Sequence, residues 1–90
     1  MKNILITGAS QGIGKATAIE AAKAKMFVGI NYNQNLKAAE ECLKLVRDSG
    51  GNGIILKCDV AINKSVKDMF NEFLDKAGTI DGVFNNAGIT

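Results

Sequence analysis

Four short apolar runs, spaced along the whole chain, constrain the fold more than any other feature. They cover residues 4–6, 27–30, 54–56 and 82–84. The runs are continuous, whereas a strand with one solvent-exposed face would alternate apolar and polar residues. Continuous apolarity is typical of strands that are buried on both faces of a parallel sheet. The runs therefore predict four parallel strands.

Three segments with helical periodicity lie between these runs. The first extends from residue 13 to about residue 25, and its predicted buried face consists mostly of small residues. Glycine follows the other two segments, at Gly50-Gly51 and at Gly78, and glycine is favoured just beyond the end of a helix. The predicted buried faces are Ile13, Ala16, Thr17, Ala21 and Ala24 in the first segment, Leu36, Ala39, Leu43 and Val46 in the second, and Val66, Met69, Phe70, Phe73, Leu74 and Ala77 in the third.

The order of the predicted elements is β-α-β-α-β-α-β, which indicates an α/β fold with a parallel sheet. Right-handed crossovers place the first two helices on one face of that sheet. If the third crossover reverses to the far side of the first strand, the strand order becomes 3-2-1-4 and the third helix lies on the opposite face. This Rossmann-type, doubly wound arrangement has a ligand-binding crevice beyond the carboxyl ends of its strands. We expect residues 1–90 to form one such domain.

A glycine-rich turn connects the first predicted strand to the first predicted helix. Gly8 allows a sharp exit from the strand, Gly12 removes a side chain where backbone could approach a diphosphate, and Gly14 lets the helix pack on the strand. The N–H groups of the first helical turn favour an anion, and Ser10 can donate its hydroxyl or cap the helix. An ordinary strand-to-helix turn is the alternative interpretation. The position of the turn inside a β-α-β unit favours a dinucleotide site.

Residues 7–14, Thr-Gly-Ala-Ser-Gln-Gly-Ile-Gly, resemble the TGxxxGxG cofactor motif of the short-chain dehydrogenases/reductases. Residues 58–60 resemble the family's Asp-Val pair, whose aspartate, here Asp59, meets the adenine ring. Residues 85–88 resemble its NNAG motif, which stabilises the central sheet and borders the cofactor. Taken singly, Asp59 could cap a strand end and residues 85–88 could form a turn. Three motifs at the ends of three strands favour the family, and the resemblance covers all 90 residues.

The end of the second predicted strand bears on the choice between NAD and NADP. A carboxylate there binds the ribose hydroxyls of NAD and repels the 2′-phosphate of NADP. Here residues 31–35 are Asn-Tyr-Asn-Gln-Asn, and the next acidic residue is Glu40. Asn31 and Tyr32 offer neutral donors, although Gln11 stands where many NADP-dependent relatives carry Arg or Lys. We therefore expect NADP(H), with NAD(H) as the alternative.

The residues expected to contact the cofactor come from the three motifs and from the end of the second strand. They are Gly8, Ser10, Gln11, Gly12, Ile13, Gly14, Asn31, Tyr32, Asp59, Val60, Asn85, Ala87 and Gly88. The Asn-Tyr pair at residues 31–32 is similar to that of the bacterial β-ketoacyl carrier-protein reductases and some sugar dehydrogenases.

The resemblance implies an oxidoreductase that transfers hydride between NADP(H) and a carbonyl or alcohol substrate. In the family a tyrosine is the acid and base, a lysine four residues later lowers its pKa, and a serine and an asparagine assist. The one tyrosine here is Tyr32, and Leu36 lies four residues later, so we assign no catalytic residue. The chain resembles the amino-terminal portion of a longer enzyme, and we expect these 90 residues alone to be inactive. They should also associate or aggregate, because the outer edge of the fourth strand presents free N–H and C=O groups. A non-catalytic dinucleotide-binding module and a structural element with an unused site are the alternatives.

The composition argues against several other classes of protein. The net charge of +2, with mixed signs, provides no basic patch for nucleic acid. The chain has no histidine, and Cys42 and Cys58 lack a CxxC spacing, so we expect no metal site and two reduced, buried thiols. The apolar runs are too short for a signal peptide or a membrane span. We expect a soluble, cytoplasmic protein, and the resemblance implies a homo-oligomer for the intact enzyme.

Overall fold

Strands and helices alternate along the chain in the computed structural model, which describes residues 2–10 and 12–86. All four apolar runs form strands and all three periodic segments form helices, as predicted. The elements are β1 (Asn3–Thr7), α1 (Gly12–Lys23), β2 (Phe27–Tyr32), α2 (Leu36–Asp48), β3 (Asn52–Lys57), α3 (Asn63–Ala77) and β4 (Gly82–Asn85). Helix α1 ends two residues before its predicted end. Helix α3 ends directly before Gly78, whose N–H donates to the Leu74 carbonyl (2.8 Å).

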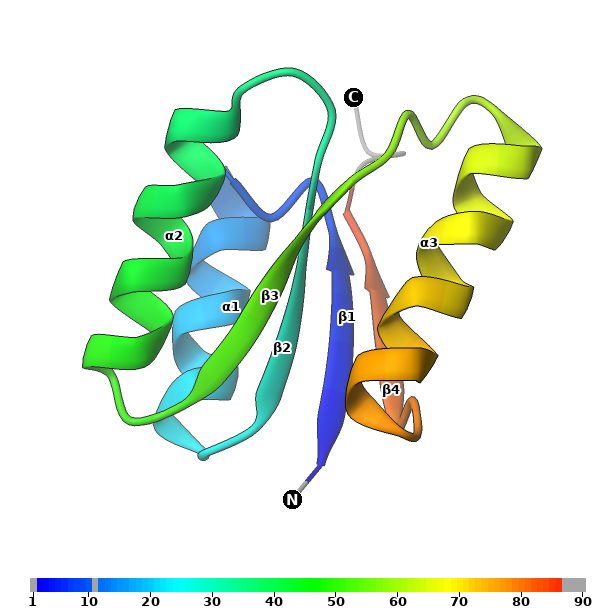
Figure 1. The fold of residues 1–90 in the computed structure, drawn as a ribbon. Helices are drawn as coiled ribbons and strands as arrows, with labels where there is room; N and C mark the ends of the chain where they lie inside the picture. Colours follow the sequence, from blue (N-terminus) through cyan, green and yellow to red (C-terminus); the bar gives the residue numbers. More distant parts are fainter. Residues whose placement is uncertain (1, 11, 87–90) are drawn as a thin grey trace.

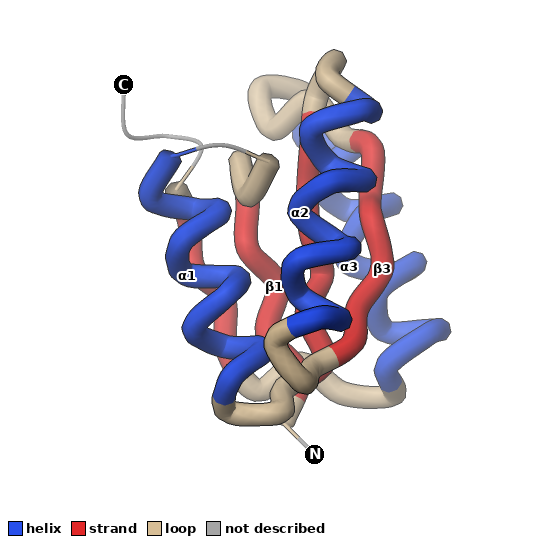
Figure 2. Tube along the Cα trace, turned by 90° about the vertical axis from the view of Figure 1, so that its left-hand side faces the viewer, coloured by secondary structure: helices blue, strands red, loops and turns tan. Residues whose placement is uncertain are grey.

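The four strands form one parallel sheet in the order β3-β2-β1-β4. Helices α1 and α2 cover one face, and α3 covers the other (Figures 1 and 2). The reversal of the third crossover is therefore confirmed: α1 and α2 connect strands that step outward from β1, whereas α3 leads to β4 on the far side of β1. The carboxyl ends of β1 and β4 meet at the point of reversal, where Thr7 is in register with Asn85.

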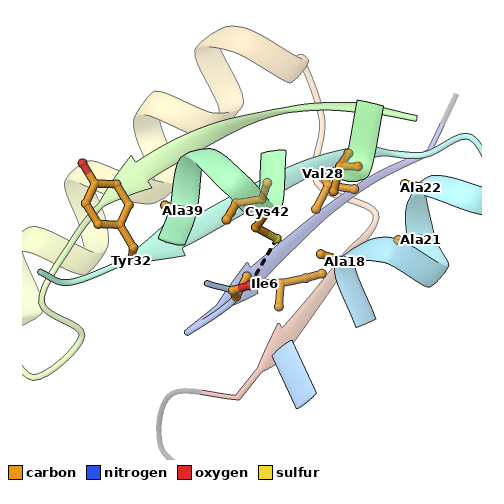
Figure 3. Close-up of a cluster of buried hydrophobic side chains, with 11 residues drawn as sticks. Ile6, Ala18, Ala21, Ala22, Val28, Tyr32, Ala39 and Cys42 are labelled. Carbon is orange, nitrogen blue, oxygen red and sulfur yellow. Dashed lines mark hydrogen bonds between the residues drawn. The ribbon is translucent and has the colours of Figure 1, made fainter. Parts of the chain in front are cut away.

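Each face of the sheet has its own apolar core. On the α1 and α2 face, side chains such as Ile6, Val28 and Cys42 are fully buried (Figure 3). On the α3 face the core is built around Phe73, which is fully buried and whose ring stacks on that of Phe27 at a centroid distance of 5.9 Å. Phe73 packs so closely on β2 that only glycine fits at position 29, where an added Cβ would lie 2.7 Å from the Phe73 ring.

The predicted buried face of α1 is wrong. The buried residues are Gly14, Ala18, Ala21 and Ala22, which recur at intervals of four, three and one. Of the predicted set, Ala21 alone is buried, and Ile13 is 66% exposed. The cause is the glycine turn: a Cβ on Gly14 would lie 2.5 Å from the Gly8 carbonyl oxygen, so this position must face inward and sets the rotation of the helix.

The predictions for the other two helices need smaller changes. In α2, Ala39 and Val46 are buried as predicted, but the third buried residue is Cys42, and Leu36 is exposed. In α3, Met69 and Phe73 are buried, whereas Leu74 is 40% exposed because it lies at the margin of the face. None of the helices in the described part of the chain has the length and hydropathy needed to cross a membrane.

Candidate functional site

The glycine turn between β1 and α1 has the backbone geometry that its sequence predicts. Gly8 and Gly12 have φ angles of +63° and +59°, values that L side chains rarely adopt. The space around the other two positions of the turn differs between Gly12 and Gly14. An added Cβ on Gly12 would meet no protein atom within 4 Å, so this position faces open space, whereas Gly14 is enclosed by the turn and by Asn86. We expected Gly14 to let the helix pack on the strand, but the atoms nearest to an added Cβ belong to the turn residues Gly8 and Ala9 and to the Asn86 side chain.

Two carbonyl groups of the turn accept hydrogen bonds from other elements. The Gly8 oxygen accepts from Asn86 Nδ2 (3.2 Å), and the Ala9 oxygen accepts from Cys42 Sγ on α2 (3.3 Å; dashed line in Figure 3). These carbonyl dipoles would repel an anion if they faced it. The N–H groups of the first turn of α1 have no carbonyl partner within the helix, and they lie next to the open position at Gly12. The turn therefore has the polarity of an anion cradle.

Asn31 does not present the free donor that we expected from the sequence. Its side chain is 2% exposed and points into the protein, where Nδ2 donates to the carbonyl oxygens of Leu56 (3.2 Å) and Cys58 (3.2 Å). Its Oδ1 accepts from the Gly8 N–H at 3.0 Å. The amide is surrounded because β2 is a central strand whose end lies between the glycine turn and the end of β3.

Tyr32 lies at the rim of the α1 and α2 core with 8% of its surface exposed, and its hydroxyl points away from the other side chains of the cluster (Figure 3). It borders a cavity of about 390 Å³ between the glycine turn and the loop after β2. The lining residues are Gly8, Ser10, Tyr32, Asn33, Gln34 and Asn35. All of these are uncharged, so a phosphate in this cavity would meet hydroxyl and amide groups and no carboxylate among them.

Asp59 and Val60 follow β3 at the same edge of the sheet. The Asp59 Oδ1 accepts from the Ala61 N–H (3.0 Å), and its carbonyl accepts from Ile62 N–H (3.0 Å), so Asp59 forms a local turn that leads into α3. Val60 lines a second cavity, of about 250 Å³, on the α3 face. This cavity is also lined by Thr7, Val66, Phe70, Val83 and Asn85.

Asn85 and Asn86 join the end of β4 to the end of β1. The Thr7 hydroxyl donates to Asn85 Oδ1 (3.1 Å) and accepts from the Asn86 N–H (2.9 Å). The side chain of Asn86 then reaches the glycine turn through the Gly8 carbonyl. Three of the residues expected to contact a cofactor, Gln11, Ala87 and Gly88, lie outside the described residues.

Three residues that hold the turn or anchor it to β4 were not among the predicted site residues: Thr7, Cys42 and Asn86. Thr7 stood within the motif, but only the pairing of β1 with β4 shows its role. Cys42 could have been found from its spacing, because it lies three residues after Ala39 and four before Val46 on the buried face of α2.

Cys42 and Cys58 lie next to the described part of the site, and the pKa of each thiol is raised. Burial raises the pKa of the Cys42 thiol, although Lys15 opposes the shift. Burial also raises the pKa of Cys58, and the carboxylates of Asp59 and Asp68 add to this shift. Neither thiol is in a disulfide. Because their pKa values are raised, both are protonated at neutral pH, which makes them poor nucleophiles. Within residues 2–10 and 12–86 there is no group of three side chains that could hold a metal ion.

Known proteins similar to this chain in sequence belong to one family. The family model described as short chain dehydrogenase matches residues 2–90. The short-chain dehydrogenase/reductase homolog YusS of Bacillus subtilis (strain 168) is 38% identical over 89 residues, which are 99% of this chain and 82% of YusS. A 3-oxoacyl-[acyl-carrier-protein] reductase of Synechocystis is 43% identical over 86 residues, which are 96% of this chain and 35% of the reductase. The chain thus spans most of YusS but about a third of this longer relative.

Solved structures share the fold and include cofactor complexes. A Burkholderia cenocepacia protein described as a dehydrogenase, with bound NADP, has a TM-score of 0.88 and 28% identity over 93% of this chain and 33% of its own. The NADH-dependent reductase A1-R′, complexed with NAD, has a TM-score of 0.88 and 33% identity over 93% of this chain and 35% of its own. The parallel sheet with its reversed crossover, the glycine turn and the family match lead to one conclusion. This chain belongs to the short-chain dehydrogenase/reductase family.

Proposed function

We propose that this chain binds a nicotinamide dinucleotide at the carboxyl ends of its strands. In this proposal residues 1–90 are the NAD(P)-binding portion of a short-chain dehydrogenase/reductase that transfers hydride between NADP(H) and a carbonyl or alcohol. The observation that carries the proposal is the polarity of the glycine turn. The Gly8 and Ala9 carbonyls are bonded to protein donors, and the open position at Gly12 adjoins the N–H groups of α1.

The diphosphate fits this turn on chemical grounds. An anion is stabilised at the amino end of a helix, and the missing side chain at Gly12 lets it approach the backbone. Ser10 and Ile13 flank this position, and Ile13 is largely exposed although it is apolar. In the proposal the exposed Ile13 side chain is covered by the bound cofactor.

The adenosine half is assigned to the ends of β2 and β3. In this proposal the uncharged cavity beside Tyr32 accommodates the ribose, and Asp59 and Val60, which follow the end of β3, contact the adenine ring. Because none of the residues that line this cavity is acidic, the proposal favours NADP(H) over NAD(H). Asn85, with Ala87 and Gly88, is proposed to border the cofactor next to β1.

When bound, the nicotinamide ring supplies the hydride, and the residues of this chain bind and orient the cofactor. Tyr32 cannot serve as the family's catalytic tyrosine, because its phenol borders the ribose cavity and Leu36, with no basic group, lies four residues later. The catalytic groups would have to come from further chain, which relatives such as the Synechocystis reductase contain in their longer sequences. We propose that these 90 residues alone are inactive. The carbonyl or alcohol substrate, a homo-oligomeric intact enzyme and a cytoplasmic location belong to the same proposal.

A non-catalytic dinucleotide-binding module is the second candidate. It is favoured by the match to YusS, a relative of which this chain spans 82%. Both candidates require saturable cofactor binding. They differ when this chain is fused to the remainder of a longer family member. The enzyme portion should then support carbonyl-dependent oxidation of NADPH, whereas the non-catalytic module should not.

The first experiment is a fluorescence titration of the chain with NADPH and NADH. We expect saturable binding that is tighter for NADPH, and an increase in Kd of about tenfold or more in Gly12→Ala, since a 1.4 kcal/mol loss is tenfold. The matched control is Gly78→Ala. Gly78 also has a positive φ (+88°) and open space around it, but it follows α3 at the opposite edge of the sheet, next to Asn3 and Thr79.

The control separates loss of the site from loss of the fold. Both substitutions strain the backbone, but only Gly12→Ala places a methyl group at the proposed diphosphate position. Equal losses of affinity in the two variants would contradict the assignment of the site. A wild-type chain that binds neither NADPH nor NADH would refute the proposed function.

A further inference from the structure

Asn31 occupies an unusual place for a polar side chain: it is buried at the point where the glycine turn, β2 and β3 meet. We infer that Asn31 is a positioning residue, which holds the glycine turn at a fixed place relative to the ends of β2 and β3. In this inference Asn31 makes no contact with the cofactor. The inference rests on the proposed function, because it concerns how the two halves of a dinucleotide site are kept in register.

On one side Asn31 holds the turn through two consecutive N–H groups. The side-chain Oδ1 accepts from the Gly8 N–H, and the backbone carbonyl accepts from the Ala9 N–H, both at 3.0 Å. Gly8 has a φ of +63°, so the backbone leaves β1 in a conformation that local propensity alone does not enforce. The two hydrogen bonds orient both N–H groups toward β2.

On the other side Asn31 holds the end of β3. Its Nδ2 donates to the carbonyl oxygens of Leu56 and Cys58 at 3.2 Å, with a longer contact of 3.4 Å to the carbonyl of Tyr32. An amide nitrogen carries two hydrogens, so these acceptors use its full capacity and leave none for a ligand. Leu56 is the penultimate residue of β3, and Cys58 directly precedes Asp59.

The amide of Asn31 therefore connects the proposed diphosphate site to the proposed adenine site. A dinucleotide contacts both at once, so its affinity depends on the spacing between them, and a preorganised spacing lowers the cost of binding. Only an amide satisfies this position. A carboxylate would still accept from Gly8 but would face the Leu56 and Cys58 carbonyls without a donor, and an apolar side chain would leave the Gly8 N–H unpaired.

The test uses two substitutions at Asn31 and one matched control. Asn31→Ala removes the side-chain bonds to Gly8 and to β3 and keeps the backbone bond from the Ala9 N–H, whereas Asn31→Asp keeps the acceptor for Gly8 and removes the donors to β3. The control is Asn3→Ala. Asn3 is also a buried asparagine (6% exposed), and its Nδ2 donates to Ala77 and Thr79, but it lies at the opposite edge of the sheet.

The first readout is amide hydrogen exchange by NMR without any ligand. In Asn31→Ala we expect Gly8 to exchange about tenfold faster or more, because its half-buried N–H loses its acceptor. In Asn31→Asp we expect Gly8 to stay protected, whereas the Cys58 N–H, which donates to the Tyr32 carbonyl, exchanges faster. Asn3→Ala should leave Gly8 and Cys58 unchanged once exchange through global unfolding is subtracted.

The second readout is the Kd for NADPH. We expect both Asn31 variants to raise it about tenfold and Asn3→Ala to leave it unchanged. Unchanged Gly8 exchange in Asn31→Ala would overturn the inference whatever the affinities are. If Asn31→Ala does not fold, Asn31→Asp decides, because loss of Cys58 protection supports the connection and full protection overturns it. A wild-type chain without NADPH or NADH affinity would refute the proposed function, while faster Gly8 exchange would still identify Asn31 as the residue that holds the turn.

Discussion

The contact between α1 and the glycine turn can be tested by Gly14→Ala. A Cβ at this position would lie 2.5 Å from the Gly8 carbonyl oxygen, 2.8 Å from Asn86 Nδ2 and 3.0 Å from the Ala9 Cα. Two of these three neighbours are backbone atoms and cannot move away by changing a rotamer. The helix must therefore shift away from the turn, and the hydrogen bond from Asn86 to Gly8 is strained or lost.

The expected change in the free energy of unfolding follows from two destabilising contributions and one stabilising contribution. Overpacking of this kind costs about 1–3 kcal/mol. Loss of the Asn86 hydrogen bond costs about 1 kcal/mol more. Alanine is favoured over glycine inside a helix by about 1 kcal/mol, which offsets the hydrogen bond. We therefore expect Gly14→Ala to lower the free energy of unfolding by about 1–3 kcal/mol.

Urea denaturation followed by circular dichroism measures this change, and the m-value should be unchanged. The double variant Gly14→Ala/Asn86→Ala identifies which neighbour matters. Because the nearest atom is the Gly8 carbonyl oxygen, removal of the Asn86 side chain should not restore stability. A Gly14→Ala chain as stable as the wild type, or more stable, would show that helix propensity prevails and would refute the close approach that sets the rotation of α1.

Two further predictions concern the core and the thiols. Phe73→Ala should lower the free energy of unfolding by about 3–5 kcal/mol, because Phe73 is fully buried against Phe27 and β2. The control is the neighbouring substitution Leu74→Ala. Because Leu74 is 40% exposed, this substitution should lower the free energy of unfolding much less in the same urea titration. Similar losses in the two variants would contradict the assignment of the α3 core. Burial raises the pKa of Cys42 and Cys58 above the ordinary value of 9.0, so the unfolded chain loses these protons at a lower pH than the folded chain. The free energy of unfolding should therefore be independent of these thiols below pH 9.0 and should fall as the pH rises through and above that value. Urea titrations from pH 7 to pH 10.5 measure this fall, and a decline just as steep in the double Cys→Ala variant would assign it to other groups.

The sequence alone was sufficient for the strands, the helices and the glycine turn. The four apolar runs form β1 to β4 because continuous apolarity is stable only where both faces of a strand are covered. The turn at residues 7–14 was identified because its glycine spacing corresponds to backbone angles that other residues rarely adopt, and Gly8 and Gly12 have such angles. The strand order 3-2-1-4 came from handedness together with the family resemblance, since a reversal of the crossover leaves no trace in local periodicity.

The tertiary structure decided how individual side chains are used. Helix α1 has small residues on every side, so its periodicity could not identify the buried face, and the close approach of Gly14 to Gly8 determines it. Asn31 was placed correctly at the end of β2, but its amide points inward to Gly8, Leu56 and Cys58. The sequence specifies which residue stands at a strand end, through local propensity and periodicity. Which partners its side chain meets depends on segments 23 to 27 residues apart along the chain, and these come together only when the sheet forms.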